Sequence, residues 1–154
     1  MQQNRLTTFF IVRHAETEHN VKGIVGANPH LTENGKMQAK TLAEEFTNKH
    51  FDCVYTSELF RTKETAQIIA KDIAAPFIST KEINERNYGI YEGKPIAEYE
   101  SDLKNVIEKM RKMSDEELYI FRRYESCEID SEMMDRFIKF LKKLHINIRG
   151  EIFW

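Results

Sequence analysis

The sequence predicts an α/β protein with a mainly parallel sheet that is flanked by helices on both faces. Short β-branched and aromatic runs have the composition of buried strands, and apolar residues recur behind them at helical spacing. Strand followed by helix, twice over, favours a parallel sheet with right-handed crossovers. A chain of 154 residues fits one compact fold with a single hydrophobic core, so we expect residues 1–154 to form one domain.

Three segments in the first half of the chain have strand composition. Residues 7–13 (TTFFIVR) predict a buried strand, residues 53–57 (CVYTS) a second strand, and residues 77–79 a third, short one. Residues 84–94 contain two glycines and are expected to form a loop. At the other end of the chain, residues 151–154 (EIFW) look like the opening of a further strand.

Four apolar stripes at helical spacing predict four helices. Thr32 is a suitable N-cap for the first helix, and Ser57 is a candidate N-cap for the second. In chain order, the stripes consist of Ala39, Leu42, Ala43 and Phe46; Ala66, Ile69, Ala70 and Ile73; Leu103, Val106, Ile107 and Met110; and Met134, Phe137, Leu141 and Leu144.

Composition and charge argue against several classes of protein. The formal net charge is −2 and the charged residues are interspersed, so no basic face for nucleic acid is indicated. No apolar run approaches the length of a membrane span, and the first residues do not resemble a secretory signal. Cys53 and Cys127 lie in unrelated contexts and are expected to be free thiols. We therefore expect a cytoplasmic protein; its oligomeric state is not indicated.

The residues that can carry chemistry gather where the predicted strands end. In an open parallel sheet, ligands bind at the carboxyl ends of the strands, near loops and helix N-termini. Arg13 and His14 end the first predicted strand, and Arg61 lies in the first turn of the helix that follows the second. We therefore expect two guanidinium groups and an imidazole at one edge of the sheet.

That set of side chains favours phosphoryl transfer through a histidine. A guanidinium matches phosphate oxygens with its planar fork of donors, and it stays charged at any working pH. A neutral imidazole has a lone pair that can attack phosphorus, and a carboxylic acid in a nearby loop can protonate the leaving oxygen. Metal ligation by His14 and His19 with the glutamates between them is not expected, because their spacing matches no helical metal motif.

Several motifs, in this order, resemble those of the histidine phosphatase superfamily, which includes phosphoglycerate mutases. The segment RHAETEHN at 13–20 is similar to the family signature Arg-His-Gly-x-Thr-x-x-Asn, with Ala15 in the place of the usual glycine. Further resemblances are LTENG at 31–35 with QA at 38–39, TSELFRTKETA at 56–66, NERNYG at 84–89 with YEGK at 91–94, and ES at 125–126 before a helix with Arg136.

The resemblance implies a phosphoglycerate mutase-like fold and a metal-independent reaction. By position, His14 becomes phosphorylated, Arg13 and Arg61 bind the phosphate, and Glu85 is the general acid. The implied partner is a small phosphorylated metabolite, and no cofactor is implied.

Three further positions are implied to bind substrate. Asn20 and the backbone near Gly26 would line the phosphate pocket, and Tyr88 would face the substrate. Each side chain also has a structural interpretation: Asn20 as a turn cap and Tyr88 as a core aromatic.

One part of the family pattern has no counterpart in the chain. The family has a second histidine in a Ser-His-Gly segment directly after a late strand, whereas this chain ends at Trp154. We therefore expect the domain to be C-terminally incomplete, either because the chain is cut short or because it is a natural fragment.

Three functions remain in competition. The first is a phosphatase that hydrolyses a small phosphomonoester through a phosphohistidine on His14. The second is a mutase that returns the phosphoryl group to its substrate, which the segment NERNYG at 84–89 favours. The third is a catalytically inactive phosphate-binding or partner-binding module, favoured by the missing second histidine.

Overall fold

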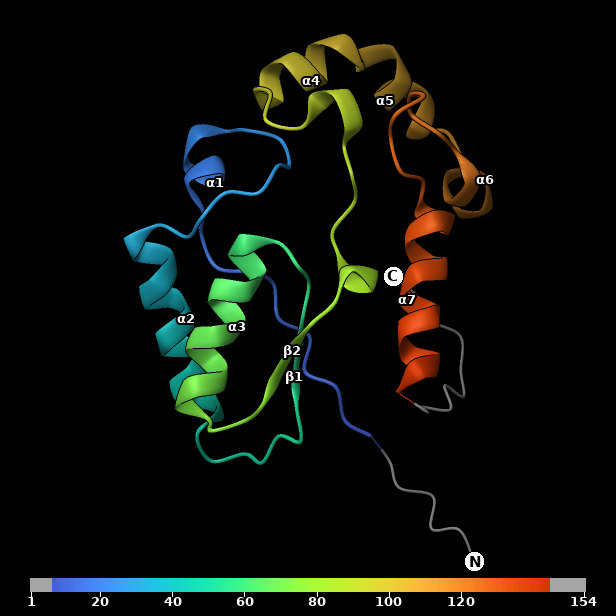
Figure 1. Cartoon of the computed structure of the whole chain (residues 1–154). Helices are drawn as coiled ribbons and strands as arrows, with labels where there is room; N and C mark the ends of the chain where they lie inside the picture. Colours follow the sequence, from blue (N-terminus) through green and yellow to red (C-terminus); the bar gives the residue numbers. More distant parts are fainter. Residues whose placement is uncertain (1–6, 145–154) are drawn as a thin grey trace, which may run out of the picture.

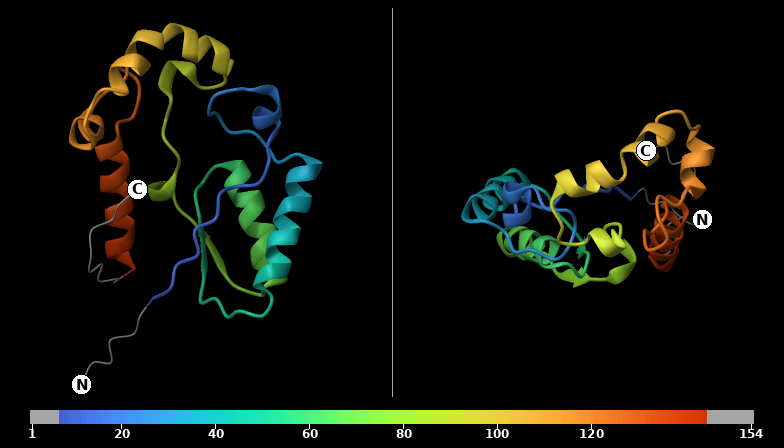
Figure 2. Two further views of the ribbon diagram at one scale, coloured as in Figure 1. Left: turned by 180° about the vertical axis from the view of Figure 1, so that it is seen from behind. Right: turned by 90° about the horizontal axis from the view of Figure 1, so that it is seen from above.

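The computed structural model describes residues 7–144 of the chain. Helices α2 (Glu33–Phe46) and α3 (Phe60–Asp72) lie side by side at one end of the molecule, and α7 (Asp130–Lys143) lies at the other (Figures 1 and 2). Two strands run between them, and a chain of short helices arches over the top (Figure 1). None of the helices within the described residues is both long and apolar enough to cross a membrane.

The two strands form a parallel pair. Strand β1 (Val54–Thr56) pairs with β2 (Phe77–Ser79), with Tyr55 opposite Ile78. Helix α3 connects them because parallel strands need a long crossover. Tyr55 on β1 makes an edge-to-face contact with Phe140 on α7, with 5.1 Å between the ring centroids. Helix α3 packs against β1 on the side away from α7 (Figure 1). The predictions of parallel strands here and of helices on both sides are confirmed.

Helices α2 and α3 pack closely because small residues face their contact. Ala39 and Ala43 on α2 are fully buried, as are Ala66 and Ala70 on α3. The Thr32 hydroxyl caps α2 by accepting a hydrogen bond from the Gly35 N–H at 2.9 Å, as the sequence predicts.

The start of α2 also approaches the segment that carries His14. A Cβ atom built on Gly35 would lie 2.1 Å from the carbonyl oxygen of Glu16, so only glycine allows this approach. The contact is closed by hydrogen bonds from the Glu16 N–H to Gln38 Oε1 at 2.9 Å and from the Thr32 hydroxyl to Glu16 Oε1 at 2.5 Å.

The prediction of a buried strand at residues 7–13 is wrong for the structure. The segment is extended but forms no ladder with another part of residues 7–144, and the Ile11 side chain is 87% exposed. Phe10 packs against Phe46 and Phe51 with its ring edge, at centroid distances of 5.6 and 5.3 Å. The local sequence shows only that the segment is apolar, whereas a strand also needs a neighbouring backbone with which to form hydrogen bonds. The strand predicted at residues 151–154 lies outside the described residues.

A second core supports the upper part of the molecule. The buried side chains of Val25, Tyr91 and Leu103 form it. Around it lie α1 (Glu18–Lys22), the 3₁₀ turn η2 (Gly89–Tyr91), and the helices α4 (Ile96–Asp102), α5 (Lys104–Met110) and α6 (Asp115–Ile120). Another 3₁₀ turn, η1 (Lys81–Ile83), packs against α7. Helices α5 and α7 confirm the third and fourth predicted helices.

Candidate active site

The segment of His14 is held against helix α3 by a buried hydroxyl. The Ala15 N–H donates to Thr65 Oγ1 at 3.1 Å, and the Thr65 hydroxyl donates to the carbonyl oxygen of Arg61 at 2.7 Å. Thr65 is buried. It lies one turn after Arg61 on the same helix, so it fixes His14 relative to that arginine. Sequence reasoning did not single out Thr65, although its spacing from Arg61 is the signal that would have found it.

The imidazole of His14 has a defined tautomer. Its Nδ1 lies 2.8 Å from the carbonyl oxygen of Ala15. A carbonyl oxygen can only accept, so Nδ1 carries the hydrogen and Nε2 keeps its lone pair when the ring is neutral. Burial lowers the pKa of His14 below its usual value, and the positive charges of Arg61 and Arg13 lower it further. The hydrogen bond to Ala15 and the charge of Glu85 oppose this without reversing it. Burial and the two arginines therefore favour the neutral form of the ring.

Arg61 joins three segments that are distant in sequence. Its guanidinium is buried, with Nη1 donating to the carbonyl oxygen of Ala27 at 2.7 Å and Nη2 donating to Glu85 Oε2 at 2.6 Å. The helix that carries Arg61 is capped from outside, because the Phe60 N–H donates to Asn28 Oδ1 at 2.5 Å. Ser57, the cap that the sequence suggested, lies two residues before the true N-cap, Leu59. Asn28 was missed because a cap supplied by a distant loop leaves no local signal.

Glu85 reaches the site from a loop. Its side chain is about half exposed (47%) and forms the ion pair with Arg61. The loop is joined to the start of α3 by a hydrogen bond from the Glu58 N–H to Asn84 Oδ1 at 2.9 Å. Arg61 and Glu85 are thus joined directly, and the charges of both act on His14.

Gly26 lies in a tight turn next to this group. Gly26 and Ala27 both have positive φ angles, of 51° and 57°. The carboxylate of Glu92 accepts hydrogen bonds from the N–H groups of Ala27 and Tyr88, the latter at 2.7 Å. A Cβ on Gly26 would lie 2.3 Å from Glu92 Oε2, so glycine leaves room for this carboxylate. Glu92 therefore shapes the turn whose carbonyl group orients Arg61.

The remaining predicted residues have different surroundings. Arg13 is exposed, and its guanidinium has no hydrogen-bond or ion-pair partner within residues 7–144. Asn20 is exposed and caps α1, accepting a hydrogen bond from the Thr17 N–H at 3.0 Å. Tyr88 is partly buried against the second core, with an edge-to-face contact to Tyr99 at 6.0 Å. Burial raises the pKa of Tyr88, and the nearby charge of Glu85 raises it further. Asn20 and Tyr88 thus make the structural contacts that the sequence also allowed.

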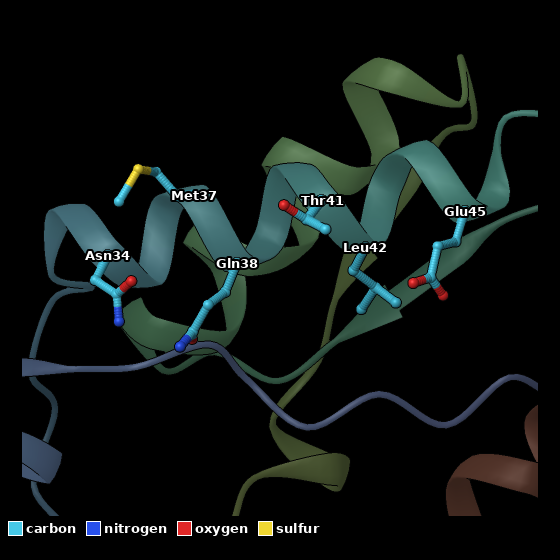
Figure 3. Close-up of a pocket in the computed structure, with 6 residues that line it drawn as sticks. All are labelled: Asn34, Met37, Gln38, Thr41, Leu42 and Glu45. Atoms are coloured by element: carbon cyan, nitrogen blue, oxygen red, sulfur yellow. The ribbon is translucent and has the colours of Figure 1, made fainter.

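A separate hollow lies on the outer side of α2 (Figure 3). It has a volume of about 390 Å³, and its lining residues are Asn34, Met37, Gln38, Thr41, Leu42 and Glu45. None of these is a predicted site residue. Within residues 7–144, no group of three or more His, Cys, Asp or Glu side chains is arranged to hold a metal ion.

Comparison with known proteins identifies relatives of the chain. Residues 9–152 match the sequence profile of a family described as the histidine phosphatase superfamily (branch 1). Phosphoserine phosphatase 1 of Hydrogenobacter thermophilus is 32% identical over 148 residues, which are 92% of this chain and 67% of that protein. A 2,3-bisphosphoglycerate-dependent phosphoglycerate mutase of Bartonella bacilliformis is 37% identical over 93 residues, which are 56% of this chain and 45% of the mutase.

The fold has solved counterparts. The structure of a mycobacterial glucosyl-3-phosphoglycerate phosphatase superimposes with a TM-score of 0.73 at 20% identity, covering 85% of this chain and 60% of that one. This likeness confirms the predicted α/β, phosphoglycerate mutase-like fold. The chain spans between 45% and 67% of the length of these three proteins.

Proposed function

Because the chain belongs to the histidine phosphatase superfamily (branch 1), we propose that it hydrolyses a small phosphomonoester through a phosphohistidine on His14. The observation that carries the proposal is the state of that imidazole. Its Nδ1 is held by the Ala15 carbonyl group, which leaves Nε2 free for attack, and burial and the charges of two arginines lower its pKa. A neutral ring beside two guanidinium groups combines a nucleophile with the electrostatic stabilisation that phosphoryl transfer needs.

The proposed reaction has two steps. First, the Nε2 lone pair of His14 attacks phosphorus, the P–O ester bond breaks, and a protonated Glu85 gives its proton to the leaving oxygen. The Nδ1–H bond to Ala15 stabilises the positive charge that the ring acquires. Then water attacks the phosphohistidine, its proton passes to the Glu85 carboxylate, and inorganic phosphate leaves. Arg61 and Arg13 bind the phosphoryl oxygens in both steps, and Arg61 exchanges its bond to Glu85 for one to phosphate.

Trapping the intermediate tests this proposal. The chain is mixed briefly with ³²P-labelled phosphoserine and quenched in base, which preserves phosphohistidine. Label is expected on the peptide that contains His14, and it should be lost in acid. His14→Ala should abolish both the label and phosphate release, whereas His50→Ala, which changes an exposed histidine, should leave both unchanged. Label on a serine, or turnover without label on His14, would refute the phosphohistidine mechanism.

The mutase remains the second candidate because the Bartonella bacilliformis relative is a phosphoglycerate mutase. The two functions differ in the acceptor of the phosphoryl group. Incubation with 3-phosphoglycerate and a trace of 2,3-bisphosphoglycerate separates them: release of inorganic phosphate supports the phosphatase, and formation of 2-phosphoglycerate supports the mutase. Phosphate binding without either product supports the inactive module.

A further inference from the structure

A loop carboxyl group such as Glu85 needs support from outside the loop if it is to act as an acid. Catalytic groups must be held to within a fraction of an ångström of their productive positions. Glu85 lies between the two 3₁₀ turns, and its side chain is about half exposed. Its bond to Arg61 cannot be the support during catalysis, because the proposed reaction uses that guanidinium for phosphate.

The support comes from Arg136 on helix α7. Its Nη1 donates to the carbonyl oxygens of Glu82 at 2.9 Å and Asn84 at 3.0 Å, directly before Glu85 in the chain. Its Nε and Nη2 bind the two carboxylate oxygens of Glu128 at 2.7 and 2.9 Å. This bidentate pair fixes the plane of the guanidinium and therefore the direction in which Nη1 points.

Glu128 binds the same loop on the other side of Glu85. Its Oε2 accepts a hydrogen bond from the Asn87 N–H at 3.2 Å, and its own N–H donates to the Asn87 carbonyl oxygen at 3.1 Å. The Arg136 and Glu128 side chains are only 26% and 17% exposed. Partial burial strengthens such charge-assisted bonds, because little water competes for them.

We propose that Glu128 and Arg136 form a positioning pair for Glu85. By binding the backbone at residue 84 and at residue 87, the pair holds the carboxyl group at the leaving oxygen of the phosphoester. This inference rests on the proposed function, in which Glu85 is the general acid. The consequence depends on the leaving group. The pair matters for hydrolysis of phosphoesters whose leaving oxygen needs a proton, and it hardly matters for phosphoesters whose leaving group departs as a stable anion.

The variant Arg136→Lys tests the pair, because lysine keeps the charge but cannot bind Glu128 and the loop carbonyl groups together. The matched control is Arg111→Lys, the same change at an exposed arginine directly after α5. Glu85→Gln is the reference for complete loss of the acid. Thermal denaturation confirms that each variant is folded. The value of kcat/KM is measured with 2,4-dinitrophenyl phosphate, a good leaving group, and with a simple alkyl phosphate, a poor one.

Glu85→Gln is expected to lower kcat/KM for the alkyl phosphate about 10²-fold or more, and for the dinitrophenyl ester only slightly. Arg136→Lys is expected to follow the same pattern at about tenfold or more, and Arg111→Lys to leave kcat/KM for both substrates unchanged. If Glu85→Gln shows the pattern and Arg136→Lys affects both substrates equally or neither, the positioning pair is refuted while the proposed function stands. If Glu85→Gln lacks the pattern, the acid role of Glu85 fails first.

Hydrogen exchange provides a readout that does not need turnover. The Glu58 N–H donates to the Asn84 side chain, so its exchange rate reports the position of the loop. Arg136→Lys should speed this exchange several-fold, whereas the Glu117 N–H, bonded to Ser114 within α6, should exchange at its original rate. Unchanged exchange at Glu58 would overturn the proposal even if the chain hydrolyses nothing.

Discussion

Replacement of Thr65 by valine tests how His14, the proposed nucleophile, is held. Valine has nearly the same shape, but it lacks the oxygen that accepts the hydrogen bond from the Ala15 N–H at 3.1 Å. Ala15 and Thr65 are both buried, so no water can replace this acceptor. A buried N–H without a partner costs about 1–3 kcal/mol. The added methyl group returns about 0.8 kcal/mol. The expected net loss in the free energy of unfolding is therefore between about 0.2 and 2.2 kcal/mol.

The measurement is urea denaturation of Thr65→Val beside Thr41→Val, the same change at an exposed position on α2. Thr41→Val is expected to change the free energy of unfolding by less than about 0.5 kcal/mol. Because Ala15 follows His14 directly, Thr65→Val should also lower kcat about tenfold or more in chain that is still folded. If both variants are equally stable, or if Thr65→Val keeps full activity, Thr65 does not hold the nucleophile in the manner described.

Two further changes probe the site. Burial and the arginine charges lower the pKa of His14, so the acid limb of kcat/KM against pH should fall below pH 6.5. Arg13→Gln removes one of these charges and should shift the limb to higher pH. NMR titration of the His14 ring should show its pKa moving upward in the same variant. A downward shift would contradict the electrostatic argument. Gly26→Ala and Gly23→Ala both place alanine at positive φ, but only at Gly26 does the new Cβ meet the Glu92 carboxylate. Thermal denaturation should therefore show Gly26→Ala to be the less stable by about 1 kcal/mol or more, and equal stability would show that Glu92 moves away at little cost.

Four of the helices, α2, α3, α5 and α7, were predictable because their signals are local. Ala39 and Ala43 recur at the spacing that places both on one face, and the Thr32 hydroxyl can accept a hydrogen bond from the Gly35 N–H in the first turn of its helix without help from the rest of the chain. The strands at 53–57 and 77–79 were predictable from the same kind of pattern, with a helix between them. The grouping of His14 with Arg61 followed from placing both behind predicted strands, although residues 7–13 form no strand in the structure.

The sequence by itself thus determined the α/β class, the family, and which residues are the candidates for the proposed phosphoryl transfer. Only the tertiary structure decided how these residues are held. Arg61 binds Glu85, Asn28 accepts a hydrogen bond from the first N–H of α3, and Arg136 binds the backbone of the loop at residue 82. These contacts join residues between 24 and 54 positions apart. A pattern of polarity tells which face a side chain occupies on its own element, whereas the partner it meets depends on where the fold places a distant loop.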